Sequence, residues 1–189
     1  ASKLFLATGD SSYLQAGIRL YEWTKENLQD PADGLYFDNK SLNGEIGRAK
    51  FAYNSGQMMQ SAALLYRITS EKKYLQDAQR LAAACYNRFF SHDSQSGRKY
   101  KVLNRGDVWF TAIMFRGFVE LYGIDRNSLY IDAFRENLDF AWTVMREKNG
   151  LFNDDWSGKT KNDSKWLLTQ FAMVEMYARL ASIDKENSR

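Results

Sequence analysis

The amino-acid sequence predicts an all-α protein built from repeated helical hairpins, and three observations support this prediction. Only one proline, Pro31, interrupts the 189 residues, so little in the chain prevents long helices. Apolar residues recur at three- and four-residue spacing, which is the period of an amphipathic helix. A short polar turn recurs before Tyr13, Tyr74 and Tyr130, which lie 61 and 56 residues apart. A repeat of this length corresponds to one helical hairpin, and we expect about seven helices in a single domain over residues 1–189.

Two kinds of helix are expected to alternate along the chain. Residues 1–7 form the end of a first helix, and each short turn is followed by an amphipathic helix, near residues 11–28, 71–89 and 126–146. The remaining helices carry no charged residue over three stretches, residues 52–66, 108–115 and 166–174. A helix that is apolar nearly all round is buried on most sides. We therefore expect an inner layer of uncharged helices covered by an outer layer of amphipathic ones.

The predicted connections alternate in length in the same way. Each inner helix leads to its outer helix through a few residues, whereas long loops lead back over residues 29–51, 90–106 and 147–164. All three long loops run into the amino end of an inner helix, so they are expected to gather on one face of the molecule. Because long loops carry function more often than short ones, this face is where we expect a site.

Aromatic and amide side chains are concentrated at this predicted face. They lie at the starts of the three inner helices and in the third long loop: Tyr53, Asn54 and Gln57, then Trp109 and Phe110, then Trp156, Trp166 and Gln170. Aromatic rings stack on the apolar faces of sugars, and sugar hydroxyls need hydrogen-bond donors and acceptors, so this combination favours a carbohydrate. Taken singly, each residue could instead be a core aromatic or a helix cap. Their recurrence at three equivalent places favours a shared cleft.

Several other features of the sequence exclude classes of function. Cys85, the only cysteine, falls on the apolar face of an amphipathic helix and is expected in the core, whereas His92, the only histidine, is expected in an exposed loop. No metal-ligand spacing occurs, so we expect neither a metal nor a cofactor. The net charge of +3 does not indicate nucleic-acid binding, and no apolar stretch is long enough to predict a membrane span. Two loop acids, Asp38 and Glu45, are expected to be solvated, although a carboxylate there could touch a ligand.

Several short motifs resemble those of glycoside hydrolase family 76. The most specific is KFAYNSGQMMQ at residues 50–60, and the others lie at residues 109–112, 149–152, 155–158 and 166–170. This resemblance covers essentially the whole chain. It implies an (α/α)6 toroid, which is a ring of six helical hairpins, and endo-acting hydrolysis of α-1,6-linked mannan. It also implies a mannan-type oligosaccharide or polysaccharide as ligand and a secreted, periplasmic or cell-surface location.

The resemblance also implies roles for individual residues. The aromatic residues named above would stack on sugar rings, and Asn54, Gln57 and Gln170 would recognise hydroxyls. Six hairpins at this period need about 350 residues, so the chain corresponds to the C-terminal half of such a ring. The family's catalytic pair, two adjacent aspartates at the start of an inner helix, belongs to the first half, and the catalytic residues therefore stay unassigned. Asp154 and Asp155 are the remaining candidates in this chain.

Two other interpretations of the same residues stay open. A non-catalytic glycan-binding helical module would bind mannan without cleaving it. A helical-repeat interaction domain would use the same aromatic face for a peptide or a partner subunit and would not respond to mannan. In the hydrolase interpretation, either a missing N-terminal half or a second copy of the chain would complete the ring.

Overall fold

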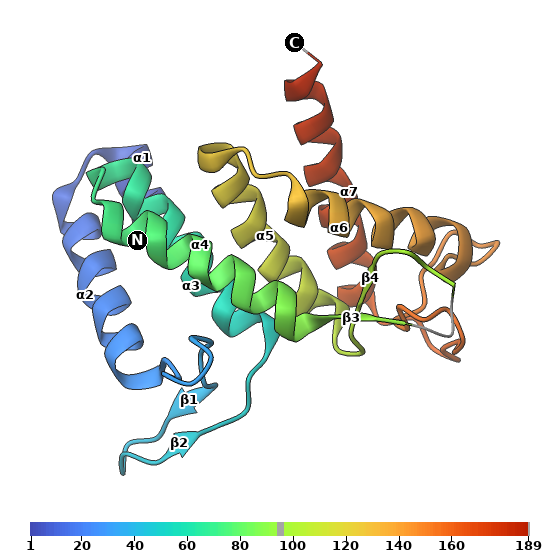
Figure 1. Ribbon diagram of the computed structural model, residues 1–189, viewed down its shortest axis with the longest axis horizontal. Coiled ribbons are helices and arrows are strands. Elements are labelled where there is room, and N and C mark those ends of the chain that lie inside the picture. Colours follow the sequence, from blue (N-terminus) through green and yellow to red (C-terminus); the bar gives the residue numbers. More distant parts are fainter. Residues whose placement is uncertain (94–96, 189) are drawn as a thin grey trace.

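The structure is a computed structural model that describes residues 1–93 and 97–188, and it consists of helices joined by alternately short and long connections (Figure 1). The helices are α1 (Ser2–Thr8), α2 (Ser11–Leu28), α3 (Ala52–Thr69), α4 (Lys72–Phe89), α5 (Val108–Asp125), α6 (Leu129–Phe140) and α7 (Leu167–Asn187). A short π-helix, η1 (Ala141–Met145), continues α6. The prediction of an all-α fold made of helical hairpins is confirmed.

The helices form the two layers that the sequence predicts. Helices α3, α5 and α7 make up the inner layer, in which each helix packs against the next, and α1 lies against α3 at one end (Figure 1). The outer helices α2, α4 and α6 follow through short turns. These turns begin at a residue with positive φ, which is Gly9 (73°), Ser70 (60°) or Arg126 (56°). A left-handed residue is a common way to end a helix, and it turns the chain back within a few residues.

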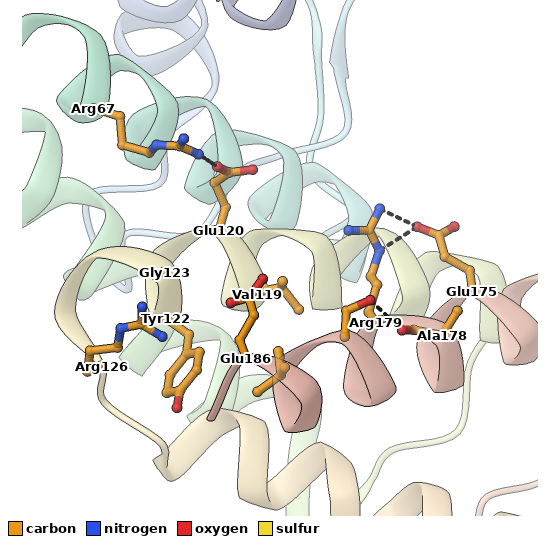
Figure 2. A pocket seen from close by; sticks show the side chains of 12 residues that line it. Arg67, Val119, Glu120, Tyr122, Gly123, Arg126, Glu175, Ala178, Arg179 and Glu186 are labelled. Atoms are coloured by element: carbon orange, nitrogen blue, oxygen red, sulfur yellow. Dashed lines mark hydrogen bonds and ion pairs between the residues drawn. The ribbon is translucent and has the colours of Figure 1, made fainter. Parts of the chain in front are cut away.

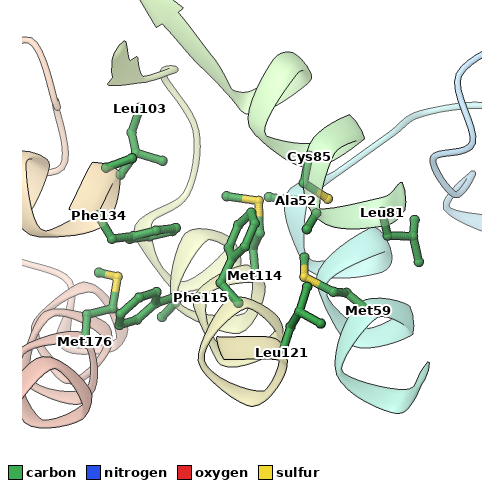
Figure 3. Close-up of a cluster of buried hydrophobic side chains, with 14 of the residues drawn as sticks. Ala52, Met59, Leu81, Cys85, Leu103, Met114, Phe115, Leu121, Phe134 and Met176 are labelled. Carbon is green, nitrogen blue, oxygen red and sulfur yellow. The ribbon is translucent and has the colours of Figure 1, made fainter. Parts of the chain in front are cut away.

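Helix α4 illustrates how an outer helix is held on the inner layer. Its buried side chains include Tyr74, Ala78, Leu81 and Cys85, which follow four- and three-residue spacing on one face. Cys85 is fully buried in the core, as predicted (Figure 3). Burial of one leucine-sized side chain contributes roughly 1.5–3 kcal/mol, so this apolar face accounts for more of the helix's stability than its intrinsic propensity does.

The inner helices continue beyond the uncharged stretches, and the charged residues they then contain are paired. The guanidinium of Arg116 on α5 donates to both carboxylate oxygens of Glu175 on α7, at 2.6 Å each, and Arg179 donates to Glu175 at 2.8 Å. Arg67 of α3 donates to Glu120 of α5 at 2.5 Å. All of these residues except Arg116 line a pocket of about 630 Å³ near the carboxyl ends of the inner helices (Figure 2). The pairs link α3 to α5 and α5 to α7.

The long loops contain two short antiparallel hairpins that the sequence does not predict. Strand β1 (Asn39–Lys40) pairs with β2 (Ile46–Gly47), and β3 (Phe90–His92) pairs with β4 (Lys101–Leu103). Strands of two or three residues are too short to show the alternation of apolar and polar residues that marks a strand. His92 is exposed, as predicted, although it lies in β3. The predicted loop 90–106 includes residues 94–96, which lie outside the described residues.

The third inner helix is less buried than the sequence predicts. On α7 the side chains of Leu167, Phe171 and Val174 are 63%, 61% and 63% exposed. Their four- and three-residue spacing places them on one side of the helix, where they form a second apolar stripe. The prediction that this helix is buried on most sides is therefore wrong, because no described segment covers this stripe.

Helices α3 and α5 approach closely because each contributes a glycine to their crossing. A Cβ atom on Gly56 would lie 2.4 Å from the Cα atom of Met114, and one on Gly117 would lie 2.7 Å from the carbonyl oxygen of Gly56. Both distances are well inside van der Waals contact, so this approach requires glycine at both positions. Gly56 lies near the amino end of α3, and the crossing therefore also fixes how the beginnings of α3 and α5 face each other.

We predict that Gly56→Ala destabilises the protein by about 1–3 kcal/mol, because the added methyl group forces the two backbones apart. Gly123→Ala is the matched control, since Gly123 is also helical but a Cβ atom there meets nothing within 4 Å. Alanine has the higher helix propensity, so the control should gain up to about 1 kcal/mol. Urea unfolding followed by circular dichroism measures both variants. Equal effects of the two substitutions would contradict a tight crossing.

Candidate functional site

Four aromatic rings meet where α3 and α5 begin, and we call these four residues the aromatic platform. Phe51 and Tyr53 come from the start of α3, and Trp109 and Phe110 come from the first turn of α5. Tyr53 lies nearly parallel to Trp109, at 13° with 5.8 Å between ring centroids, and nearly parallel to Phe51, at 7° and 5.8 Å. Phe110 lies 4.6 Å from Tyr53 and 4.3 Å from Trp109. Three of the rings are half-buried and Phe51 is exposed, so the platform presents aromatic surface to solvent.

The carboxylate of Asp38 holds the first long loop on the platform. The hydroxyl of Tyr53 and the side-chain amide of Asn54 both donate to the same oxygen of Asp38. The hydrogen bond from Tyr53 lowers the pKa of Asp38 below its ordinary value. The other end of the Asn54 amide accepts from the backbone N–H of Phe51 at 3.3 Å. Asp38 therefore sets the position of the Tyr53 ring, and the amide of Asn54 is engaged on both sides.

Further contacts hold this loop on the amino end of α3. The ammonium of Lys50 donates to the carboxylates of Asp30, at 2.6 Å, and Asp33, at 2.8 Å. The backbone N–H of Tyr36 donates to the buried hydroxyl of Ser55 at 3.0 Å. Lys50 and Ser55 flank Phe51 and Tyr53 in the chain, so these contacts tie the first long loop to the same turn of α3 that carries Tyr53.

The start of α7 holds the third long loop through Gln170. Its side-chain amide accepts from the backbone N–H of Phe152 at 2.8 Å and donates to the carbonyl oxygen of Phe152 at 2.9 Å. This pairing matches one rung of a β-sheet and fixes the loop against the helix. Trp166, at the amino end of α7, is 56% exposed, and no ring contact joins it to the platform in the described residues.

Two other predicted binding residues lie away from the platform. Trp156 is 1% exposed, and its carbonyl oxygen accepts from the guanidinium of Arg98 at 3.2 Å. Gln57 is exposed and lines a pocket of about 360 Å³ with residues of α1 and α2, including Leu20. The structure thus brings Tyr53, Asn54, Trp109 and Phe110 together and leaves Gln57, Trp156, Trp166 and Gln170 outside that cluster.

The candidate acids Asp154 and Asp155 lie in the third long loop and bond to it. Asp154 accepts from the amide of Asn162 at 3.0 Å. Asp155 accepts from the backbone N–H and the hydroxyl of both Ser157 and Thr160, at 2.7–2.9 Å. Burial alone would raise the pKa of Asp155, but the hydrogen bonds from Thr160 and Ser157 outweigh it and lower the pKa to about 2. Asp155 is therefore ionised at neutral pH and has no proton to give to a leaving group.

Neither a metal cluster nor a membrane-spanning helix is found in residues 1–93 and 97–188. No three or more His, Cys, Asp or Glu side chains among them are arranged to hold a metal ion. None of the helices described combines the length and the apolar character that crossing a bilayer needs.

Phe51 is a platform member to which the sequence analysis assigns no role. It precedes the helix and stacks on Tyr53, and an aromatic residue directly before a predicted helix start is the signal that could have indicated it. The pairing of Asp38 with Tyr53 spans 15 residues between a loop and a helix, and no local pattern indicates it.

Comparison with protein families gives one match. The profile of glycosyl hydrolase family 76 matches residues 1–188. No curated protein sequence matches the chain.

The chain is also similar to several solved bacterial structures. A family 76 mannosidase from Bacteroides thetaiotaomicron VPI-5482 is 38% identical, with a TM-score of 0.91, over 98% of this chain and 52% of that protein. A family 76 glycoside hydrolase from a bovine strain of that species is 36% identical, with a TM-score of 0.90, over 97% and 41%. An inactive variant of the α-1,6-mannanase of Salegentibacter sp. HEL1_6, with two neighbouring aspartates changed to asparagine and α-1,6-mannotriose bound, is 26% identical, with a TM-score of 0.80, over 96% and 56%.

This chain spans about half the length of these relatives. Its helices correspond to about half of an (α/α)6 toroid, which confirms the predicted fold class.

We predict that Asp38→Asn lowers the free energy of unfolding by about 1 kcal/mol at pH 7, because it weakens the hydrogen bonds to Tyr53 and Asn54 at a partly exposed site. Because the folded-state pKa of Asp38 is lowered, its stabilising contribution is present above the unfolded-state pKa and is lost as the pH falls through the folded-state value. Urea unfolding at pH 7 and at about pH 3 should therefore give a smaller difference between wild type and variant at acid pH. Glu136→Gln, on the exposed side of α6, is the control. A difference in the free energy of unfolding between wild type and variant that grows at low pH would contradict a stabilising role of the ionised Asp38 carboxylate.

Proposed function

Because the chain belongs to glycoside hydrolase family 76, we propose that it is the sugar-binding half of an endo-acting α-1,6-mannan hydrolase. The aromatic platform is the observation that carries this proposal. Its stacked Tyr53 and Trp109 rings offer flat, partly solvated faces on which the C–H face of a sugar ring can stack. Support also comes from the Salegentibacter relative, which binds α-1,6-mannotriose.

Hydroxyl recognition requires polar groups that the protein itself leaves available. The amides of Asn54 and Gln170 already bond to the protein, so in this proposal they position Phe51 and Phe152. The amide of Gln57 is exposed and has no hydrogen bond to the residues that the structure describes. We assign direct hydroxyl contacts to Gln57 and an additional stacking surface to the exposed ring of Trp166.

The carboxylates that cleave the glycosidic bond come, in this proposal, from outside the chain. Retaining hydrolysis needs one carboxylate to attack the anomeric carbon and a second carboxyl group, about 5–5.5 Å away, to protonate the leaving oxygen. Asp155 is ionised and saturated with hydrogen bonds, so it suits neither role. The Salegentibacter relative is inactive when two neighbouring aspartates are replaced, and we propose that an equivalent pair lies in the other half of the ring.

Exposed apolar surface at both ends of the chain supports a covering partner. The stripe of Leu167, Phe171 and Val174 lies on α7 at one end, and Leu20 and Trp23 on α2, at the other, are 64% and 50% exposed (Figure 1). Contiguous apolar surface of this kind marks an interaction site in soluble proteins. Since the relatives are about twice as long as this chain, we propose the remaining half of the ring, and not a second copy, as the partner.

A polysaccharide substrate does not cross membranes, so we also propose an extracellular or cell-surface location.

One observation favours a second candidate function, a glycan-binding module without hydrolysis. Both candidate acids of this chain form hydrogen bonds within their own loop. Such a module would use the same platform and would bind mannan without releasing reducing ends.

We predict that Trp109→Ala weakens binding of α-1,6-mannotriose about tenfold, because a stacked aromatic contact contributes up to about 1.5 kcal/mol beyond its buried area. Isothermal titration calorimetry on the purified chain measures the affinity. Trp23→Ala is the matched control, because it removes an exposed tryptophan of α2 outside the platform and should leave the affinity unchanged. Wild-type affinity in Trp109→Ala, or no binding by the wild type, would contradict the proposal.

A further inference from the structure

We propose that a pocket beside η1 and the start of the third long loop binds the phosphate group of a phosphorylated sugar through Arg146, Lys148 and Lys161. These residues belong neither to the aromatic platform nor to the other predicted sugar-binding residues. The choice of an anion as ligand follows from the three cationic side chains. The choice of a sugar as the carrier of the phosphate rests on the proposed function.

This pocket, which we call the cationic pocket, has a volume of about 520 Å³. Its lining comes from η1, from the residues that follow it and from one lysine further along the third long loop, and it includes Val144, Arg146, Glu147, Lys148, Asn153 and Lys161. Small-molecule sites commonly have volumes of about 300–1,000 Å³, so a monosaccharide phosphate fits this one. The cationic pocket shares no lining residue with the pocket that borders Phe51 and Phe110 of the platform.

The cations of this pocket are available to a ligand. Arg146, Lys148 and Lys161 are exposed, and none of them forms an ion pair within residues 1–93 and 97–188. Glu147 also lines the pocket, but its charge is compensated by the ammonium of Lys165, which donates to it at 2.8 Å. The pocket is therefore rich in hydrogen-bond donors with uncompensated positive charge, and it suits a ligand that carries negative charge and acceptor oxygens.

Arg146 is held in a position that favours an anion. Its guanidinium lies over the indole ring of Trp142, with 3.8 Å between the guanidinium carbon and a ring centroid. A guanidinium that stacks on an aromatic ring still presents its N–H groups at the edge, where they can donate to a phosphate. The backbone of Arg146 also pairs with Phe152 in an isolated β-bridge, and its N–H donates to the carbonyl oxygen of Ala141 at 3.0 Å. Both ends of this side chain are therefore positioned before a ligand binds.

The loop that forms the pocket is fixed to η1 by the side chain of Asn153, which is 3% exposed. Its amide donates to the carbonyl oxygen of Met145 at 3.0 Å, and its oxygen accepts from the ammonium of Lys165 at 2.6 Å. π-Helices such as η1 are rare and occur frequently at functional sites. A pocket whose walls are already ordered costs less conformational entropy when it binds a ligand.

The number of cations favours phosphate over a carboxylate. A phosphate monoester carries about 1.5 to 2 negative charges at neutral pH and has three acceptor oxygens, whereas a carboxylate has one charge and two oxygens. Three cationic side chains therefore match a phosphate better. The pocket is much larger than a phosphate group, and the exposed side chain of Val144 adds an apolar contact for a sugar ring.

The test removes the three positive charges together, in the variant Arg146→Gln/Lys148→Gln/Lys161→Gln. Calorimetry at constant ionic strength measures the affinity of the purified chain for mannose 6-phosphate, mannose and inorganic phosphate. We expect the wild type to bind mannose 6-phosphate about tenfold more tightly than either other probe, and the triple variant to lose about tenfold in this affinity. Affinity for α-1,6-mannotriose should stay at the wild-type value, because the aromatic platform is intact.

The matched control is Arg19→Gln/Lys72→Gln/Lys185→Gln. It makes the same chemical changes and the same change in net charge at exposed positions of α2, α4 and α7. This control should bind mannose 6-phosphate as the wild type does. An equal loss of affinity in the control would show that only the overall charge attracts the ligand, and it would overturn the site.

The other outcomes separate this inference from the proposed function. Wild-type affinity of the triple variant for mannose 6-phosphate would overturn the phosphate site and leave the proposed function standing. Inorganic phosphate that binds as tightly as mannose 6-phosphate would overturn the sugar as carrier. A wild type that binds mannose 6-phosphate but not α-1,6-mannotriose would support the phosphate site and overturn the proposed function.

Discussion

The close crossing of α3 and α5 at Gly56 and Gly117 is the constraint on which the candidate site depends. Because the two backbones touch there, the first turns of both helices lie side by side, and Tyr53 can stack on Trp109. A larger residue at either glycine would separate the helices and therefore the rings. The glycine of the KFAYNSGQMMQ segment, Gly56, thus has a packing role, while its tyrosine, Tyr53, belongs to the aromatic platform.

Different contacts hold the two ends of the inner layer. At the amino ends, the loop carboxylate of Asp38 bonds to α3, and the amide of Gln170 on α7 bonds to the third long loop. Towards the carboxyl ends, the ion pair between Arg67 and Glu120 joins α3 to α5 (Figure 2). Near the middle of α5 and α7, the ion pair between Arg116 and Glu175 joins these two helices. The apolar stripe of α7 belongs to neither set, and in our proposal it is the surface on which the rest of the ring packs.

The sequence predicts the hairpin repeat well because each helix carries its own periodic pattern. It also places Tyr53, Trp109 and Phe110 on one face, since all three follow long loops into inner helices. It does not predict the pairing of Gln170 with Phe152 or the burial of Trp156, because these depend on how a loop folds back on a helix. The sequence does not predict the exposure of α7 for a related reason: the absence of charge on a helix does not show whether another segment of the chain covers it.

The most direct test of the central claim, that this chain binds the sugar and lacks the groups that cleave it, is an assay of the purified chain on α-1,6-mannan. Calorimetric binding and released reducing ends are measured on the same preparation. We predict saturable binding with no release of reducing ends above the buffer control. Release of reducing ends by the chain alone, abolished in Asp155→Asn, would contradict this claim and would place catalysis in the third long loop.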